Sequence, residues 1–404
     1  KPYVVGVWPG DSVFPDVLDP EARKWFGSQY KVLLDEGIEG FWNDMNEPSI
    51  FYSKKRLNSA LEQVAAARGT NMPLEEYHRI LGAIGSLANN RKDYAEFYHE
   101  TPFGRVTHLS VHNLFGSYMT QAAADYFSEY EPDKRFLLFS RSSHIGMHRS
   151  AGIWTGDNAS WWSHLLLNLK MLPSLNMCGF LYVGADIGGF GDNTTEDLLL
   201  RWLALGVFTP LMRNHSTLDT RGQECFRFER KEEFRNLLGI RYALVPYLYS
   251  EFVKCAVRGE MMFRPLAFDY PNDRRARTVE DQLLLGEGLM IAPVYEQNAA
   301  GRYVYLPESM KMIRMRSATD YRTETLKAGD HYLEIPLGEI VFFVRKGHAL
   351  PLANPALCVD LLDESALNWI SFGGTEYELY VGKGERKSEL KNALKKVKVS
   401  ASAK

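Results

Sequence analysis

The chain has 404 residues, 45% of them hydrophobic and 24% charged, which suits one large domain with smaller ones and is too apolar for an intrinsically disordered protein. A formal net charge of -3, with no extended basic block before the last residues, excludes the electrostatic footprint of a nucleic-acid-binding protein. No uncharged apolar run reaches the roughly 18 residues that a membrane-spanning helix needs.

The cysteines and the first residues favour a cytoplasmic protein. The four cysteines lie far apart and form no CxxC pair, so we expect reduced thiols rather than a disulfide framework or a zinc ribbon. Lys1 to Val7 lacks the layout of a signal peptide. Because Tyr3 to Trp8 already has the pattern of a strand, we expect the chain to begin inside a domain, and an export signal upstream of Lys1 is left open.

Residues 1–258 have the pattern of βα units built around a parallel sheet, because short apolar runs alternate with amphipathic stretches. Helical periodicity runs from Trp25 to Leu34, from Val111 to Met119 and from Phe234 to Leu248. Six strands are predicted, at Tyr3–Trp8, Gly40–Asp44, Arg135–Arg141, Gly152–Thr155, Gly179–Ala185 and Phe208–Arg213.

Residues able to do chemistry stand at or just after the end of each predicted strand: Trp8, Asp44, Arg141, Asp157, Asp186 and His215. A (β/α)8 TIM barrel gathers the carboxyl ends of its strands at one rim, where its active site lies. We therefore predict a (β/α)8 barrel in which these side chains face one pocket. Because about six strands cannot close an eight-stranded barrel without unpaired edges, two further strands are expected before Lys1, in the parent chain.

Two regions depart from this pattern. Residues 53–104 are too long for an ordinary βα loop and carry helical periodicity from Leu74 to Ile84, which predicts a helical excursion over the rim. From residue 259 on, short β-rich pieces predict small antiparallel β domains, one at 259–352 and a distal segment at 353–404. The expected strands are Arg302–Leu306, His331–Ile335, Ile340–Val344 and Tyr377–Val381, and the lysine-rich end, Lys391–Lys404, is expected to be a solvated basic tail.

Asp44 and Asp157, two of the aspartates at predicted strand ends, are the candidates for a reacting pair. Asp44 follows a strand that carries Trp42 on the same side, and Asp157 follows Gly156, which permits close approach of a ligand. Cleavage of a glycosidic bond with retention needs one carboxylate to attack the anomeric carbon and a second carboxyl, about 5 Å away, to protonate the leaving oxygen. The two aspartates would meet this need, with Asp157 held protonated at first by the negative charge of Asp44.

Several motifs, in the right order, resemble those of glycoside hydrolase family 31. The block from Trp42 to Pro48, the triplet from Gly156 to Asn158 and the run from Gly184 to Phe190 resemble its catalytic signatures. An ordered series of motifs is far more specific than any one of them. Further matches are Val7-Trp8-Pro9-Gly10, Phe14-Pro15-Asp16, His112-Asn113-Leu114, Arg141-Ser142, Met212-Arg213-Asn214-His215, Arg264-Pro265-Leu266, Ala292-Pro293-Val294, Tyr305-Leu306-Pro307 and Phe343-Val344-Arg345.

Carried over residue by residue, the resemblance implies a retaining α-glycosidase with Asp44 as the nucleophile and Asp157 as the acid/base. It implies no cofactor and no metal, and an α-linked oligosaccharide as the substrate, with a homo-oligomer left open. Asn43 and the run from Arg213 to Ser216 look most like bacterial α-glucosidases, which favours glucose. The implied walls of the sugar pocket are Trp8, Trp42, Met45 and Phe190, and the implied partners of the sugar hydroxyls are Arg141, Asp186 and His215.

The sequence also departs from the family pattern. The family's barrel begins earlier and supplies a further substrate-binding aspartate, and a preceding β-sandwich domain lends a loop to the pocket. Both are expected from the parent chain. Near the end, Gly382-Lys383-Gly384 stands in place of an acidic turn after Tyr380, so the distal β domain matches the family less well.

Plainer interpretations exist for each residue taken alone. Asp44 or Asp157 could cap a helix, as aspartate often does at a βα junction. Arg141 could be a buried ion-pair partner, Asp186 a turn residue among glycines, and His215 a satisfied core histidine. These interpretations weaken because all of the residues would have to coincide at one rim in family order.

Three other functions stay open. Within the same family, an α-xylosidase or a transglucosidase would use the same mechanism. A noncatalytic carbohydrate-binding protein on a glycosidase scaffold is a second class, although an intact aspartate pair speaks against it. A metal-dependent hydrolase is a third, with His112, His144 and His148 as candidate ligands, although Gly146 between the last two predicts a loop instead of a helix.

Overall fold

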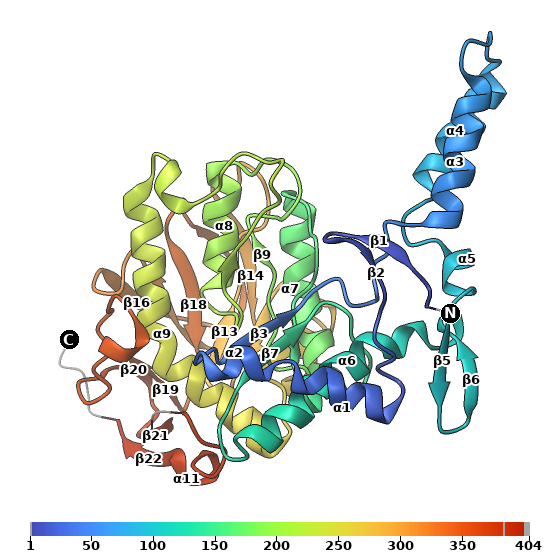
Figure 1. The fold of residues 1–404 in the computed structure, drawn as a ribbon. Coiled ribbons are helices and arrows are strands. Elements are labelled where there is room, and N and C mark those ends of the chain that lie inside the picture. Colours follow the sequence, from blue (N-terminus) through green and yellow to red (C-terminus); the bar gives the residue numbers. More distant parts are fainter. Residues whose placement is uncertain (1, 383, 400–404) are drawn as a thin grey trace. The chain divides into compact units, whose positions relative to one another are not determined.

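A computed structural model describes residues 2–382 and 384–399 of the chain. The chain divides into two compact units, Lys1–Ala151 and Gly152–Lys404 (Figure 1). Both units hold βα segments, and the antiparallel sheets of the C-terminal part belong to the second. Among the described residues, no helix combines the length and the apolarity needed to cross a membrane.

The first unit contains the parallel strand pair that the sequence predicts. Strand β3 (Gly40–Asn43) pairs with β7 (Leu137–Ser140) so that Asn43 lies opposite Ser140. Asp19 caps the first helix, because its side chain accepts a hydrogen bond of 2.8 Å from the backbone N–H of Glu21. The helices of this part are α1 (Pro20–Ser28), α2 (Lys31–Asp35) and α6 (His108–Tyr130), and their core with the strands holds Leu34, Phe41, Ala123, Phe127 and Leu138.

The first predicted strand does not belong to a parallel sheet. Strand β1 (Val5–Val7) pairs antiparallel with β2 (Gly10–Ser12) and with β4 (Tyr52–Ser53). Gly10 has a φ of 103°, a conformation that favours glycine, and it lets the chain reverse directly after Trp8. The prediction of a parallel barrel strand at Tyr3–Trp8 is therefore wrong, because a local hairpin takes up its hydrogen bonds.

The excursion at residues 53–104 is helical, as predicted. In Figure 1 helices α3 and α4 lie side by side and project from the rest of this unit. A buried carboxylate anchors the excursion: Asp93 accepts hydrogen bonds from Ser53 Oγ at 2.8 Å and from Arg56 Nε at 3.1 Å. The elements of this region are α3 (Lys54–Ala67), α4 (Leu74–Gly85), α5 (Arg91–Tyr94), β5 (Tyr98–Thr101) and β6 (Gly104–Thr107).

The second unit begins with further βα segments. The strands predicted at 179–185 and 208–213 are largely wrong, because β9 covers only Asp186–Ile187, just after the first range, and β10 (Arg213–Asn214) shares only Arg213 with the second. Leu211 N–H nevertheless donates to Val183 O at 3.1 Å. A Cβ on Gly184 would lie 2.1 Å from Leu211 O, so glycine permits this close approach. The other elements are β8 (Gly152–Ile153), α7 (Trp162–Met177), α8 (Glu196–Gly206) and α9 (Lys231–Arg258).

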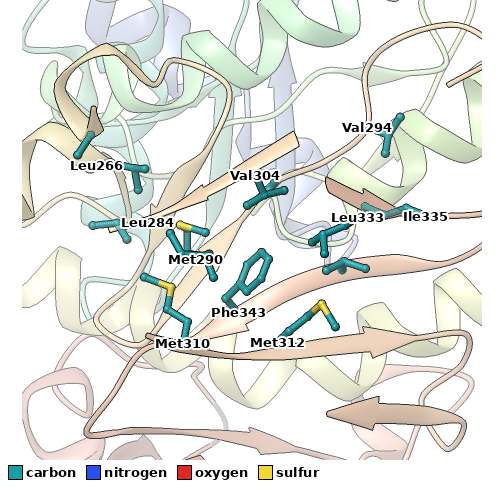
Figure 2. Close-up of a cluster of buried hydrophobic side chains, with 14 residues drawn as sticks. Leu266, Leu284, Met290, Val294, Val304, Met310, Met312, Leu333, Ile335 and Phe343 are labelled. Carbon is teal, nitrogen blue, oxygen red and sulfur yellow. The ribbon is translucent and has the colours of Figure 1, made fainter. Parts of the chain in front are cut away.

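The C-terminal part consists of antiparallel β structure, as predicted, and an apolar core is formed by residues between 266 and 343. Strand β18 (Ile340–Val344) has the predicted bounds, and a six-stranded sheet runs in the order β11-β12-β13-β18-β15-β16. Figure 2 shows the buried side chains packed around Met290 and Phe343, among them Met310 and Met312. The other strands are β11 (Phe263–Pro265), β12 (Leu283–Leu285), β13 (Leu289–Ile291), β14 (Gly301–Leu306), β15 (Met310–Met315), β16 (Tyr321–Leu326), β17 (Gly329–Glu334), β19 (His348–Leu352), β20 (Asn368–Phe372) and β21 (Glu376–Tyr380).

The lysine-rich end is not simply a solvated tail. Helix α11 (Leu390–Ala393) leads into strand β22 (Leu394–Lys398), which pairs antiparallel with β21. Buried Ala393 packs with Val253 and Tyr380, so this segment contributes to the core. The prediction of a tail is wrong for residues 391–398, because apolar side chains among the lysines pack inward. Residues 400–404, which the same prediction includes, lie outside the described residues, as does Lys383 of the turn after Tyr380.

A buried ionic cluster joins β21 to helix α9. Glu251 and Lys254 are each 1% exposed, and their charged groups lie 2.7 Å apart. Tyr377 donates from its hydroxyl to Glu251 Oε1 at 2.8 Å, and the N–H of Glu287 donates to Oε2 at 2.9 Å. The ammonium of Lys254 also lies 4.2 Å from the centre of the Tyr377 ring. Glu251 therefore ties the distal β segment to the helix.

Replacing Glu251 with alanine should lower the free energy of unfolding by about 3 kcal/mol, because Lys254 would keep a buried charge with only the more distant carboxylate of Glu287, 3.6 Å away. Chemical denaturation followed by circular dichroism measures this loss. Glu232 and Arg235 form an exposed ion pair on the same helix, so Glu232→Ala is the matched control and should change stability by no more than about 0.5 kcal/mol. Equal losses for both variants would contradict the structural role given to Glu251.

Candidate functional site

Asp44 leaves the end of β3 on the more exposed face of that strand. Phe41 and Asn43 are buried, whereas Trp42 and Asp44 are exposed, which is the alternation of a strand with one covered face. The Trp42 ring stacks on Phe139 with 6.0 Å between centroids and 8° between planes. Tyr30 fixes the covered face by donating from its hydroxyl to Asn43 Oδ1 at 2.7 Å. An aromatic ring and a carboxylate thus lie on the same face, as predicted.

Arg141 joins two carboxylates beyond the end of β7. Its Nε and Nη2 donate to the two oxygens of Glu47 at 2.8 and 3.0 Å, which is a bidentate pair. Its Nη1 lies 3.3 Å from Asp44 Oδ1. Of the interpretations of Arg141 that the sequence left open, the ion-pair partner is therefore observed. Glu47 gains a definite part, because it holds the guanidinium beside Asp44.

Asn46 is a residue of this site that sequence reasoning missed. It is buried, it donates from Nδ2 to Ser140 Oγ at 2.8 Å, and its Oδ1 accepts from the N–H of Ser142 at 3.1 Å. These bonds tie the loop after β3 to the loop after β7. The available signal was its position between two acids in a strand-end block, which does not distinguish a structural amide from a ligand contact.

Two other predicted wall residues lie in the first unit. Trp8 is 75% exposed and meets Phe51 edge to face, with 5.1 Å between ring centroids. Met45 is partly buried and has a φ of 54°, which is uncommon for a residue other than glycine. Its N–H donates to Asp44 Oδ1 at 2.8 Å, so the backbone turn helps to orient the Asp44 carboxylate.

Asp157 lies on an exposed loop of the second unit that is tied to a neighbouring loop. Gly156 before it has a φ of 80°, and Asn158 after it is buried. Asn158 donates from Nδ2 to Asp186 O at 3.1 Å and accepts at its own carbonyl from the N–H of Phe190 at 2.6 Å. The segment that carries Asp157 and the segment that carries Phe190 therefore hold each other in place.

Asp186 is a fully buried carboxylate paired with Arg213. The parallel register of β9 and β10 sets these two residues opposite each other, and Arg213 Nη2 lies 2.6 Å from Asp186 Oδ1. Arg213 also lies 5.6 Å from the centre of the Trp154 ring. Asp186 is thus more than a turn residue among glycines. Arg213 stands in one of the recognised motifs, but the sequence analysis gave it no role.

Phe190 and His215 lie against each other, with 5.4 Å between ring centroids and 34° between planes. The backbone supports the pair, because the N–H of Thr217 donates to Phe190 O at 3.0 Å. Buried Gln223, which sequence reasoning missed, places Nε2 at 3.1 Å from both Gly189 O and His215 O. No motif pointed to Gln223, since it follows the His215 block by eight residues in a segment without pattern.

The structure thus assembles two groups of predicted residues, one in each unit. The first holds Asp44 with Arg141, near Trp42 and Met45, and the second holds Asp186, Phe190 and His215 beside the Asp157 loop. Within the ranges 2–382 and 384–399 there is no group of three or more His, Cys, Asp or Glu side chains that could hold a metal ion. That Asp44 and Asp157 face one anomeric centre stays a prediction.

The loop between Asp186 and Gly191 yields a test with an internal control. Gly189 has a φ of 94°, and a Cβ there would lie 2.4 Å from the backbone nitrogen of Ser160. Gly189→Ala should therefore lower the free energy of unfolding by about 1–3 kcal/mol and displace Phe190. A Cβ on Gly191 would have nothing within 4 Å, so Gly191→Ala should cost less than about 0.5 kcal/mol in a melting experiment. Two equally stable variants would contradict this description of the loop.

Comparisons with known proteins agree with the motif series. The glycosyl hydrolases family 31 TIM-barrel domain matches residues 1–251, and the family's C-terminal domain matches residues 259–350. Alpha-glucosidase 2 of Bacillus thermoamyloliquefaciens is 32% identical over 390 residues, covering 95% of this chain and 44% of that protein. Mouse lysosomal alpha-glucosidase is 33% identical over 374 residues, covering 88% of this chain and 38% of that protein.

Solved structures give the same result. The Flavobacterium johnsoniae GH31 dextranase FjDex31A, complexed with glucose, has a TM-score of 0.76 and 25% identity, covering 98% of this chain and 46% of that one. The GH31 alpha-xylosidase of Xanthomonas citri, with a TM-score of 0.74 and 20% identity over 98% of this chain and 41% of its own, shares the fold. The chain spans less than half the length of these relatives. The fold is that of a TIM-barrel domain followed by a β-rich domain, and the chain belongs to glycoside hydrolase family 31.

Proposed function

We propose that the protein is a retaining exo-α-glucosidase, which releases terminal α-linked glucose from the non-reducing ends of oligosaccharides. The observation that carries the proposal is the exposed Asp44 carboxylate at the end of β3, oriented by the Met45 N–H and by Arg141. A nucleophile must be accessible and held in one direction, and these contacts leave the carboxylate exposed. A binding protein would have no use for such an arrangement.

The proposed reaction has two steps. Asp44 attacks the anomeric carbon, the bond from that carbon to the leaving oxygen breaks, and Asp157 gives its proton to the oxygen. Water then attacks the same carbon, Asp157 takes a proton from the water, and the bond from the sugar to Asp44 breaks. Both transition states carry positive charge on the sugar, which nearby carboxylates stabilise. The exposed position of Asp157 on a loop fixed by Asn158 supports this role.

In the proposed sugar pocket, aromatic rings form the walls and charged side chains bind the hydroxyl groups of the sugar. Trp8 and Trp42 offer exposed rings that suit the apolar faces of a sugar, and Phe190 with His215 offers a second pair. Arg141 and Asp186 already hold ion pairs, so each is fixed in direction before a hydroxyl arrives. Met45 is proposed as the remaining wall residue, and an α-linked oligosaccharide as the partner, with no cofactor.

The choice of glucose rests on relatives. The bacterial and mouse proteins that cover most of this chain are named alpha-glucosidases, which supports glucose over xylose. The α-xylosidase is 20% identical and supports the fold alone. A transglucosidase would share every residue named above. The four cysteines are unpaired, which fits the reducing cytoplasm, the location we propose.

The mechanism is tested with p-nitrophenyl α-glucoside. Proton NMR should detect α-glucose as the first product, because two displacements at one carbon restore its configuration. Asp44→Ala should lower kcat by at least about 1,000-fold, since the variant lacks the nucleophile while keeping the sugar contacts. Asp35→Ala, which removes an exposed carboxylate on α2, is the control and should keep full activity.

Three results would reject the mechanism. Appearance of β-glucose first would mean inversion, undiminished turnover by Asp44→Ala would remove its assigned role, and loss of activity on adding a chelator would favour a metal-dependent hydrolase. Binding of maltose without any turnover by the unaltered protein would favour the noncatalytic carbohydrate-binding alternative.

The substrate is tested separately, by comparing kcat/KM for p-nitrophenyl α-glucoside and p-nitrophenyl α-xyloside. The glucoside carries a hydroxymethyl group that the xyloside lacks, and a pocket that binds this group with a hydrogen bond should favour the glucoside by about 100-fold or more. A preference for the xyloside would overturn the choice of glucose and leave the mechanism in place.

A further inference from the structure

Three histidines and one aspartate form a continuous line of hydrogen bonds inside the first unit. Asp16 Oδ1 lies 2.7 Å from His99 Nδ1, and His99 Nε2 lies 2.9 Å from His108 Nδ1. His108 Nε2 in turn lies 2.9 Å from His112 Nδ1. Both ring nitrogens of His99 and of His108 are therefore engaged, and each bond passes from one imidazole to the next.

The two middle members of this line, His99 and His108, are buried. His108 is fully buried, and its ring stacks on Phe97 with 4.4 Å between centroids. His99 is almost as deeply buried, on strand β5 of the excursion, whereas His108 and His112 stand one turn apart on α6. Both ends are less buried, since 27% of the Asp16 side chain is exposed and His112 is partly exposed. The line thus crosses the core between two partly exposed ends.

The hydrogens on the line can be assigned from its chemistry. An ionised carboxylate only accepts hydrogen bonds, and a neutral imidazole has one N–H and one acceptor nitrogen. With all three imidazoles neutral, His99 donates from Nδ1 to Asp16 and accepts at Nε2 from the Nδ1–H of His108. His108 in turn accepts at Nε2 from the Nδ1–H of His112, which leaves the Nε2 of His112 as an acceptor.

Burial supports a neutral imidazole at His108 and at His112, and the hydrogen bonds of Asp16 support an ionised carboxylate. Burial, with the neighbouring His99 and His112, lowers the pKa of His108 to about 3, so this imidazole is neutral. Burial also lowers the pKa of His112, against the opposite effect of Glu47. For Asp16, burial acts to raise the pKa, but the hydrogen bonds from His99 and from the Glu100 N–H outweigh it, so the pKa is lowered.

The electrostatics of the His112 end are linked to Glu47. The negative charge of Glu47 acts to raise the pKa of His112 and the pKa of the Tyr94 hydroxyl. The Tyr94 ring stacks on the His112 ring, with 4.8 Å between their centroids. Asp93 is the other charged group that acts on Tyr94. Glu47 is also the carboxylate that holds Arg141 beside Asp44. A positive charge on His112 would therefore interact with Glu47, the carboxylate that holds Arg141 beside Asp44.

We propose that Asp16, His99, His108 and His112 form a proton relay between the neighbourhood of Glu47 and solvent. A proton binds to Nε2 of His112, whose Nδ1 proton passes to Nε2 of His108. The Nδ1 proton of His108 passes to His99, and that of His99 passes to Asp16, which releases one proton to water. One proton enters and one leaves, and each imidazole ends with its hydrogen on Nε2 instead of Nδ1.

The relay is tested by nitrogen NMR of protein labelled with 15N-histidine, which distinguishes the two neutral forms of each imidazole. At pH 7 the unaltered protein should show His99, His108 and His112 all with hydrogen on Nδ1. Hydrogen on Nε2 in any of them, or a mixture of forms, would overturn the assignment. The measurement needs no substrate, so a protein without glycosidase activity would reject the proposed function and leave the relay standing.

A substitution at Asp16 tests whether a change at one end of the line alters the position of the hydrogen on His112, at the other end. In Asp16→Asn, the N–H of Glu100, 2.7 Å from Asp16 Oδ2, should keep the amide oxygen on its side and turn the NH2 group toward His99, because the competing bond from the Leu18 N–H to Oδ1 is longer, at 3.3 Å. His99 must then accept at Nδ1, and every ring along the line, including His112, should move its hydrogen to Nε2. Asp19→Asn is the matched control, because Asp19 caps α1 and contacts no histidine, and should leave all three rings unchanged.

A variant that interrupts the line of hydrogen bonds distinguishes proton transfer along the line from a general change in folding. His108→Phe keeps a ring against Phe97 but has no nitrogen to pass a proton. In this background the form of His112 should be the same with aspartate or asparagine at position 16. A shift of His112 that persists without His108, or the lack of any shift in Asp16→Asn itself, would reject the relay.

Discussion

The ion pair between Arg141 and Glu47 is the interaction on which the candidate nucleophile depends. It exists because β3 and β7 run parallel and in a register that sets Asn43 beside Ser140, so the residues that follow each strand meet at one edge. Asn46 closes the same edge with two buried hydrogen bonds. Asp44 then needs few contacts of its own, since its surroundings are already fixed, and its carboxylate can stay accessible.

In the second unit, the candidate site residues are held in place by close approach of backbone segments as well as by an ion pair. Gly184 and Gly189 let neighbouring segments come nearer than a side chain would allow. The buried pair of Asp186 and Arg213 then occupies adjacent strand ends, where each charge compensates the other. The loops that carry Asp157 and Phe190 are joined through the backbone around Asn158, so the candidate acid and the candidate wall residue depend on one support.

Much of the fold could be predicted from the sequence because its signals are local. The periodicity of α4, α6 and α9 and the bounds of β18 follow from the spacing of apolar residues. The pairing of β1 with the distant β4 could not be predicted, and neither could the strand at the lysine-rich end, which depends on which side chains find a core. In the site, the sequence identified Asp44, Arg141 and Asp186 but gave no structural part to Asn46, Arg213 or Gln223.

The sequence by itself determined the family, through ordered motifs, and the residue types available for chemistry at each strand end. Only the tertiary structure decided their pairings: Arg141 with Glu47 and Asp44, Asp186 with Arg213, and His99 with His108. The physical reason is that a strand end fixes where a side chain starts, whereas its partner comes from another segment, and the choice among charged partners depends on distances that no local pattern contains.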